Sequence, residues 1–170
     1  MGKSLETSKG SVWALFLTAH AVLVETIERR LAAAGLPPFG WYDVMWGLER
    51  AENQKLRMNE LADKVVLSRS NLTRLIDRLE EAGLVKRERS EKDRRGAFAV
   101  LTDDGKAMRR RMWPVYAKAI KELFEDRVSE AQAQVMGTAL RAILEAARAR
   151  PAAEPADSTH LAHQQRVRKA

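Results

Sequence analysis

Arginine, asparagine and hydroxyl side chains gather on one short stretch of the chain. Leu72, Leu75, Ile76 and Leu79 recur at three- and four-residue spacing there, which predicts an amphipathic helix. The polar residues exposed at its start are Ser68, Arg69, Ser70, Asn71, Thr73 and Arg74, with Arg78 one turn later. Arginine suits guanine, asparagine suits adenine, and hydroxyl groups can bond to phosphate or base. The first acid of the helix is Asp77, so its beginning suits a polyanionic groove.

A second concentration of charge follows directly. The runs "LVKRER" and "AFAVLT" are β-prone, and "SEKDRRG" joins them, which predicts a β-hairpin with a charged tip. Lys92, Arg94 and Arg95 lie in that tip, where a projecting loop can enter the narrow minor groove of DNA. Asp93 would be repelled by phosphate, so we expect it to turn inward and orient Arg78 or Arg95.

The order of elements predicts a winged helix-turn-helix. "NELADKVVL" predicts a short helix over 59–65, and only a few residues separate it from the helix over 68–82, which Gly83 ends. So short a connection makes two helices cross steeply. A major groove about 12 Å wide admits one helix, whose amino-terminal side chains reach base edges. The helix and the hairpin would then be two halves of one DNA clamp.

Longer helices are predicted on both sides of this lobe. They cover residues 11–34, ended by Gly35, then 41–51, a helix from about 103 capped by Thr102, and 129–148 capped by Ser129. Pro114 should kink the third of these or start a second segment. In the last helix, the spacing places Val135, Leu140, Ile143 and Leu144 inward. The predicted fold class is therefore mainly α (α+β), a winged helix-turn-helix with flanking helices.

These elements predict one domain with two extensions. Residues 1–10 form a flexible N-terminus, 11–148 a single domain, and 149–170 a disordered tail. Within the domain, 56–102 is the DNA-binding lobe, and the regions 11–55 and 103–148 are helical.

Composition narrows the function classes. Net charge is +7 and the pI about 10.0, which favours a polyanionic partner, although a solvated basic surface would give the same numbers. With no cysteine, disulfides and thiol chemistry are excluded. No catalytic motif, cofactor motif or metal cluster is found, so we expect no enzyme, no cofactor and no metal. The apolar run 12–24 is too short to span a bilayer and no export signal is recognised, which predicts a cytoplasmic protein with no membrane partner.

Residues 56–105 closely resemble the winged-helix segment of MarR-family transcription regulators. The matching pieces are "ELA" (60–62), "LS" (67–68), "TRLIDRLEEAGLV" (73–85), "DRR" (93–95) and "LT..G" (101–105). The resemblance implies an obligate homodimer, in which the flanking dimerisation helices of 11–55 and 103–148 form the helical dimerisation region. It also implies a pseudo-palindromic operator in double-stranded DNA, and release by a small, often phenolic, ligand. One departure is Arg57, which stands where the family often has a capping Ser or Thr. Because Asn59 could cap instead, a shifted helix start is expected.

The resemblance also implies a ligand cleft beside the dimerisation helices. The candidate residues are Trp13, Leu17, His20, Tyr42 and Trp46, whose aromatic walls suit a planar aromatic acid. The same residues could simply form core. The leading hypothesis is a dimeric, sequence-specific regulator, more a repressor than an activator. The alternative is a non-specific architectural DNA-binding protein, which the ten basic and eight acidic residues of 58–100 disfavour, because a coating protein needs a larger positive surplus.

Overall fold

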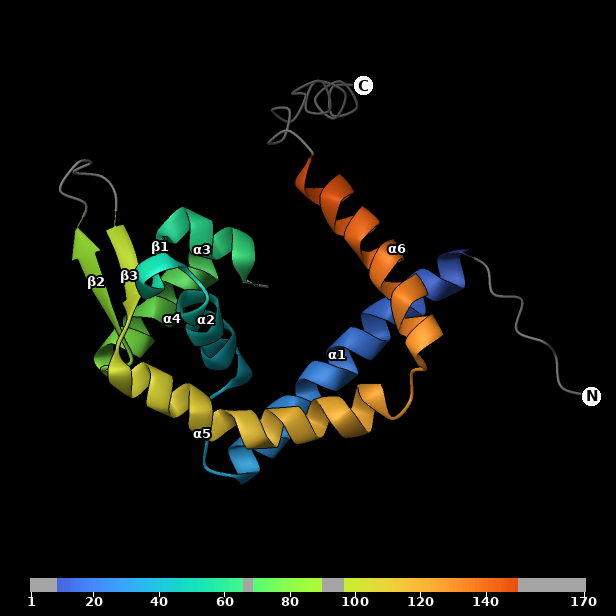
Figure 1. The fold of residues 1–170 in the computed structure, drawn as a ribbon, viewed down its shortest axis with the longest axis horizontal. Coiled ribbons are helices and arrows are strands. Elements are labelled where there is room, and N and C mark those ends of the chain that lie inside the picture. The colour runs from blue at the N-terminus through green and yellow to red at the C-terminus, as the bar shows by residue number, and fades with distance from the viewer. Residues whose placement is uncertain (1–8, 66–68, 90–96, 150–170) are drawn as a thin grey trace, which may run out of the picture. The chain divides into compact units, whose positions relative to one another are not determined.

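The structure is a computed structural model that describes residues 9–65, 69–89 and 97–149. The chain divides into two compact units, Met1–Glu125 and Asp126–Ala170. The first holds α1 (Lys9–Ala33), α2 (Phe39–Glu49), a 3-10 turn (Glu52–Gln54), β1 (Lys55–Arg57), α3 (Met58–Lys64), α4 (Arg69–Glu81), β2 (Val85–Arg89), β3 (Ala97–Leu101), α5 (Asp103–Ile120) and a π-helical turn, Lys121–Glu125. The second holds α6 (Glu130–Arg148) (Figure 1).

The core of the first unit joins the helix-turn-helix to the sheet. Its fully buried side chains come mainly from α2, α3 and α4 and include Val44, Met45, Leu48, Leu61, Leu72, Ile76 and Leu79. The three-residue and four-residue steps between Leu72, Ile76 and Leu79 put one face of α4 into this core, as the sequence predicted. The mainly helical winged helix-turn-helix class is therefore confirmed.

The sheet has one strand more than predicted. Its order is β1–β3–β2 and all neighbours are antiparallel, so the predicted hairpin of β2 and β3 is confirmed and β1 is an addition. β1 has only three residues, too few for an alternating pattern to be recognised in sequence. Leu56, Ala99 and Arg87 pair across the three strands. Since Leu56 and Ala99 are buried, this row belongs to the core face of the sheet.

The turn between α4 and β2 is a Schellman motif at Gly83. The amide of Leu84 donates to the carbonyl of Leu79 at 2.9 Å, and the amide of Gly83 donates to that of Glu80 at 2.9 Å. Gly83 has φ +72, a left-handed conformation that a side chain would strain. Buried Leu84 packs after the turn, so β2 runs back along α4 toward its amino end.

The start of α5 is attached to this turn. Thr102 caps α5 as predicted: its hydroxyl oxygen accepts from the amide of Gly105 at 3.0 Å. The same hydroxyl donates to the carbonyl of Gly83 at 2.8 Å. Gly105 lies so close to the turn that a Cβ there would stand 2.2 Å from the carbonyl oxygen of Leu84. The sequence piece "LT..G" therefore packs the start of α5 against the turn between α4 and β2, through Thr102 and Gly105.

α1 ends in a second Schellman motif and caps the next helix. Gly35 has φ +65, and the amide of Leu36 donates to the carbonyl of Leu31 at 3.0 Å. Pro38, at the cap position of α2, offers no side-chain hydrogen bond. The carboxylate of Glu28 replaces it, accepting from the amide of Phe39 at 3.0 Å with each oxygen. A negative charge there is favourable because the helix dipole is positive at its amino end.

Two local predictions are wrong. α3 begins at Met58 with Arg57 as its cap residue, so the expected shift to Asn59 does not occur. The carboxylate of Glu60 accepts from the amide of Arg57 at 3.0 Å, which is the reverse half of a capping box and satisfies a different donor from the one that a capping hydroxyl would bind. Of the two outcomes expected at Pro114, a second segment is absent, since α5 continues through it to Ile120, and a kink stays a prediction. The helical pitch changes only at the π-helical turn.

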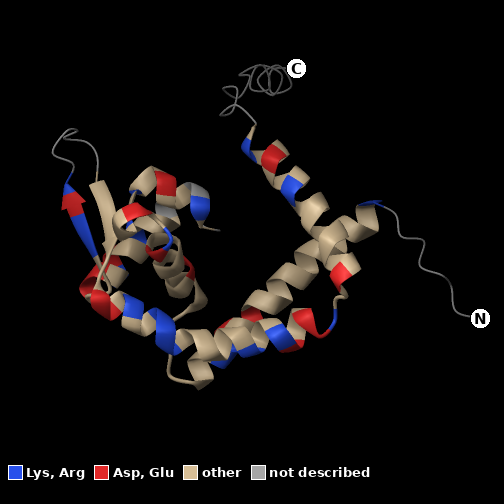
Figure 2. Cartoon of the chain, in the orientation of Figure 1, with Lys and Arg blue, Asp and Glu red and all other residues tan. Residues whose placement is uncertain are grey.

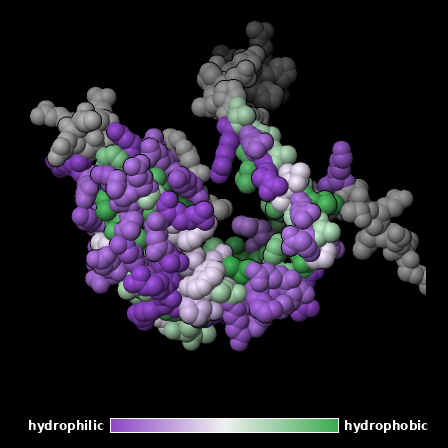
Figure 3. Space-filling view, viewed as in Figure 1, coloured by the Kyte–Doolittle hydropathy of each residue, from purple (hydrophilic) through white to green (hydrophobic). Residues whose placement is uncertain are grey.

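Both long outer helices keep apolar side chains exposed. On α1 these are Val12, Trp13, Leu15, Phe16, Leu17 and Val22, and on α6 they are Val135, Met136, Ile143 and Leu144. The inward placement predicted for α6 is therefore wrong within the single chain, and Leu140 is only half-buried. Hydrophobic surface is visible on α6, whereas the lobe around β2 and β3 is mostly hydrophilic (Figure 3). Apolar faces of this kind are typical of surfaces that pack against another element or another chain.

The prediction that the apolar run 12–24 is too short for a bilayer needs correction. The helix that contains it has 25 residues and mean hydropathy 1.5 over its most apolar window, so it is long and apolar enough to cross a membrane. Length and composition alone are weak evidence, because core helices of soluble proteins pass the same test. The predicted domain boundaries stay a prediction, and the predicted tail, most of the predicted flexible N-terminus and the hairpin tip lie outside the described residues.

Gly105→Ala should destabilise the fold by about 2–4 kcal/mol, because the added methyl meets a backbone oxygen that cannot move without breaking the Gly83 turn. Urea denaturation followed by circular dichroism measures this. Gly137→Ala in α6 is the matched control: its Cβ meets only the flexible end of Arg141, at 3.4 Å. The control should be neutral or stabilising, because alanine favours helix. Equal midpoints for Gly105→Ala and wild type would contradict this account.

Candidate nucleic-acid interface

α4 carries its polar side chains on two flanks beside the buried stripe. At 100° per residue, Arg74 and Arg78 lie on one flank, and Asp77 and Glu80 on the other, which faces β2. Arg74 and Arg78 are exposed, and neither forms an ion pair with another described residue. Asn71 is exposed too, at the amino end of the helix. The flank away from β2 is therefore cationic, which suits a phosphate-lined groove.

Arg87 of β2 holds the two acids of the opposite flank. Its guanidinium forms ion pairs with Asp77 and with Glu80, the latter at 2.7 Å between Nη1 and Oε2. Its backbone amide also donates to Glu80 Oε1 at 2.9 Å. The other guanidinium nitrogen, Nη2, donates to the carbonyl of Thr73 at 3.5 Å. Partial burial lowers the pKa of Arg87, but the hydrogen bonds and charges of both acids outweigh it and raise that pKa.

This arrangement changes the charge that α4 presents to a ligand. Without Arg87, two carboxylates would lie beside the helix that is predicted to enter the groove, and each would repel phosphate. With Arg87 present, Asp77 and Glu80 are bound to the wing, which is the hairpin of β2 and β3. The charges of Arg74 and Arg78 are therefore not neutralised by these two acids. In the described residues, Asp77 and Glu80 thus pair with Arg87 and not with Arg74 or Arg78.

Strand alternation explains why Arg87 reaches α4 and its neighbours do not. Lys86 and Glu88 belong to the outer face of the sheet, where Lys86 Nζ lies 2.8 Å from Glu88 Oε1. Blue and red segments follow each other along β2 (Figure 2). On the same outer face, Lys55 and Arg57 lie over the ring of Phe98, at 5.0 Å and 5.1 Å from its centroid. These cation–π contacts keep two positive side chains on the wing.

Several predicted contact residues cannot be placed. Ser68 and the tip residues Lys92, Asp93, Arg94 and Arg95 lie outside the described residues. Arg69 and Ser70 belong to the first turn of α4, and only their backbone is described. Thr73 is exposed on the flank that faces β2. The predicted DNA-binding set thus stays a prediction, with Asn71, Thr73, Arg74 and Arg78 placed on the surface of α4.

The five predicted ligand residues have different environments. Trp13, Leu17 and His20 lie on the exposed part of α1, and Trp46 is exposed on α2 with Arg50 over its ring at 4.8 Å. Tyr42 is buried instead, with ring centroids 4.8 Å from Tyr116 and 6.3 Å from Trp113 of α5. Burial raises the pKa values of Tyr42 and Tyr116, so both phenols are protonated at neutral pH.

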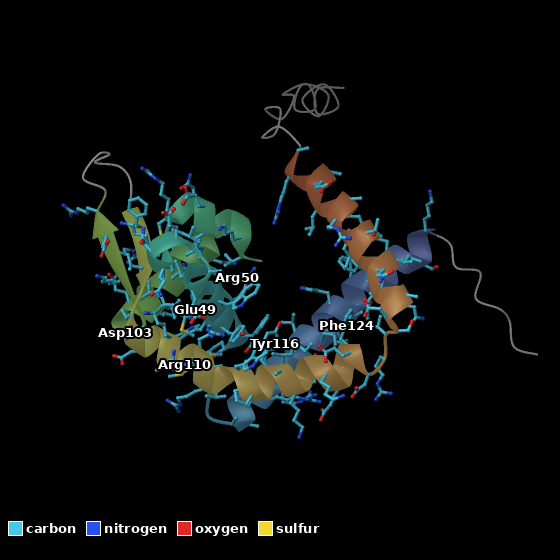
Figure 4. All side chains as sticks on the ribbon, in the orientation of Figure 1. Glu49, Arg50, Asp103, Arg110, Tyr116 and Phe124 are labelled. Carbon is cyan, nitrogen blue, oxygen red and sulfur yellow. The ribbon has the colours of Figure 1, made fainter. Side chains whose placement is uncertain are left out.

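Beside Tyr42, a partly buried ion pair connects α2 to α5. Arg109 Nε contacts Glu49 Oε2, although the direction of its N–H does not make this a hydrogen bond, and Nη1 donates to the hydroxyl of Tyr42 at 3.5 Å. Glu49, at the end of α2, and Tyr116, on α5, are labelled in Figure 4 on the facing sides of these helices. The contact fixes α5 against the helix that supports α4.

Sequence reasoning missed Arg87 as a positioning residue. The run "KRER" was interpreted as part of a uniformly charged hairpin, because four successive charged residues hide the alternation of side chains between the two faces of the strand. The signal was present in the strand pattern. Val85 is apolar and points inward, so every second residue after it, beginning with Arg87, shares its face.

Arg87 and Glu80 should be energetically coupled by about 1 kcal/mol in a double-mutant cycle of Arg87→Ala and Glu80→Ala, measured by urea denaturation. The value is modest because the Arg87 side chain is 30% exposed. The control is a cycle on Lys106 and Asp103, a pair of 2.8 Å whose acid is 95% exposed, where coupling below about 0.5 kcal/mol is expected. Equal coupling in the two cycles would show that Arg87 does not position α4.

Comparison with known proteins agrees with this geometry. The family model of the MarR family matches residues 34–96. The regulator PrsX of Escherichia coli is 32% identical over 110 residues, 65% of this chain and 66% of that protein. The transcriptional repressor MprA of Escherichia coli K12 is 34% identical over 110 residues, 65% of this chain and 62% of that protein. The alignments thus span slightly less than two thirds of these relatives.

A solved structure extends the similarity over most of the chain. Sco3205, a MarR family transcriptional regulator from Streptomyces coelicolor solved in complex with DNA, superposes with a TM-score of 0.76 at 31% identity. The match covers 86% of this chain and 91% of that one. Together with the helix-turn-helix, the wing and the cationic flank of α4, this shows that the chain belongs to the MarR family of transcriptional regulators.

Proposed function

We propose that the protein binds its operator as a homodimer, represses transcription from it in the cytoplasm, and is released by a small aromatic acid. The observation that carries the DNA-binding part is the division of charge on α4, in which Arg87 holds the acids on one flank and Arg74 and Arg78 stay exposed on the other. Asn71 and Arg74 then read bases, while Arg94 and Arg95 of the hairpin tip contact phosphates in the minor groove.

Dimerisation is supported by the exposed part of α1. The exposed apolar side chains each have 41–68% of their surface accessible, and at 100° per residue they spread over about 220° of the helix circumference; they are Val12, Trp13, Leu15, Phe16, Leu17 and Val22. A helix that is apolar on so many sides is stable in water only when it is surrounded. α6 adds an apolar stripe of its own. A second copy of the chain supplies matching surfaces, and two copies present two recognition helices to the half-sites of a pseudo-palindrome.

Repression is supported by a relative, and ligand release by the surroundings of Tyr42 and Trp46. MprA, which is 34% identical over the aligned part, is named a transcriptional repressor. The ligand would contact some of Trp13, Leu17, His20, Tyr42 and Trp46. Arg109 already donates to the hydroxyl of Tyr42, and the ring of Trp46 is open to solvent. An aromatic acid that contacts this region would act on α2 and α5, whose relative position the Arg109–Glu49 pair fixes.

Fluorescence anisotropy on DNA from immediately upstream of the coding region tests the DNA-binding proposal. The wild-type protein should bind this duplex more tightly than a scrambled one, and salicylate should weaken the binding. Asn71→Ala or Arg74→Ala should lose about 1–3 kcal/mol of discrimination at particular base pairs. Arg94→Ala or Arg95→Ala should weaken binding to both duplexes and lower the salt slope by about 1.

The comparison of the two duplexes also distinguishes the proposed regulator from the alternative, an architectural DNA-binding protein. Equal affinity of the wild-type protein for both, with a steep salt dependence, would indicate an architectural DNA-binding protein and contradict the proposal. Equal losses on both duplexes for Asn71→Ala and Arg74→Ala would show that these residues contact only the backbone. Binding that ignores salicylate and related aromatic acids would remove the ligand from the proposal and leave the rest.

Leu15→Glu should convert the dimer to monomers or lower its association constant by at least tenfold, because a carboxylate would be buried in an apolar interface. Analytical ultracentrifugation measures the association. Glu52→Gln is the control, since Glu52 is exposed beside the sheet and should leave the dimer intact. A Leu15→Glu protein that remains fully dimeric would contradict the assignment of α1, and flotation of the wild-type protein with lipid vesicles would indicate a membrane as the covering surface instead.

A further inference from the structure

Three cations of β2 have three different environments. Lys86 lies on the outer face of the sheet and is paired with Glu88. Arg87 lies on the core face and is bound by Asp77 and Glu80. Arg89 shares the face of Arg87, is exposed, and forms no ion pair or hydrogen bond with any other residue that the structure describes. Since its cross-strand neighbour is Ala97, no long side chain shields it across the hairpin.

The position of Arg89 relative to α4 follows from the Gly83 turn. β2 returns along α4 toward the amino end of the helix, and Arg87 reaches as far as the carbonyl of Thr73. Two further residues of strand advance about 6.7 Å, which equals about four residues of helix at 1.5 Å each. Arg89 is therefore level with the first two turns of α4, where Asn71 and Arg74 lie. It lies on the β2 side of the helix, opposite the flank of Arg74 and Arg78.

A helix in the major groove has a phosphate strand along each side. We propose that Arg89 binds a phosphate of the strand on the β2 side, between the major groove that α4 enters and the minor groove that the hairpin tip enters. A guanidinium suits this role because its planar donors bind two phosphate oxygens at once. Arg74 and Arg78 would contact the other strand or the bases, so α4 would be held from both sides. This inference rests on the proposed DNA binding and adds a contact that the resemblance did not supply.

The test compares Arg89→Gln with Lys86→Gln in anisotropy titrations over 50–200 mM salt. Both variants lose one positive charge from the same strand, but only Arg89 faces α4. Loss of one phosphate contact lowers the salt slope by about 0.9. The affinity defect of Arg89→Gln should therefore be about threefold larger at 50 mM than at 200 mM salt, on cognate and scrambled duplex alike. Lys86→Gln should keep the wild-type slope, and Arg89→Lys should recover most of it.

Folding is checked by urea denaturation, where both exposed positions should leave the midpoint unchanged. Equal slopes for Arg89→Gln and Lys86→Gln would overturn the phosphate contact, because a general effect of net charge does not depend on the face. Arg89→Gln with the wild-type slope, in a protein that still prefers the upstream duplex, would overturn the role of Arg89 and leave the proposed function intact. If the wild-type protein bound both duplexes equally, sequence-specific regulation would be overturned. The comparison of salt slopes would still test whether Arg89 contacts a phosphate.

Discussion

The turn at Gly83 and Leu84 is the constraint on which the rest of the DNA-binding lobe depends. Three elements meet there: the end of α4, the start of β2, and the first turn of α5 through Thr102 and Gly105. The left-handed conformation of Gly83 sets the direction in which β2 returns along the helix. That direction fixes which strand residues face α4, and so places Arg87 opposite two carboxylates. A change in the turn by one residue would move Arg87 to the outer face of the sheet.

The charge that the lobe presents to DNA then depends on the strand register, which decides which charged side chains are paired, and less on the number of charges. The numbers of acidic and basic residues in the lobe are nearly equal, so the lobe would not attract DNA through a large excess of lysine and arginine. Acids and bases are sorted by face instead: Arg87 holds Asp77 and Glu80, Glu88 holds Lys86, and Arg74, Arg78 and Arg89 stay unpaired among the described residues. Cations in such positions act at short range, where groove geometry matters, and their effect over longer distances is screened by salt.

Sequence reasoning recovered the elements that local chemistry specifies. The apolar spacing of Leu72, Ile76 and Leu79, the capping hydroxyls of Thr102 and Ser129, and the glycines after α1 and α4 all act within a few residues, and each prediction was confirmed. It failed where the partner is distant in the chain. β1 is a strand only because β3 lies beside it, Glu28 caps a helix eleven residues further on, and Arg87 pairs across the wing. The inward placement of Val135, Ile143 and Leu144 failed because the spacing finds an apolar face but does not say what covers it.

The exposed helix α1 has a consequence for how such a regulator would respond to its own abundance. If a second copy covers Leu15 and its neighbours, a lone protomer carries a hydrophobic surface of the kind that chaperones and proteases engage. Unpaired copies would then be cleared faster than paired ones, and the paired fraction rises with concentration by mass action. Occupancy of an operator that needs two copies would grow more steeply than the amount of protein made. A moderate change in synthesis would thus switch the bound gene more sharply than a monomeric regulator could.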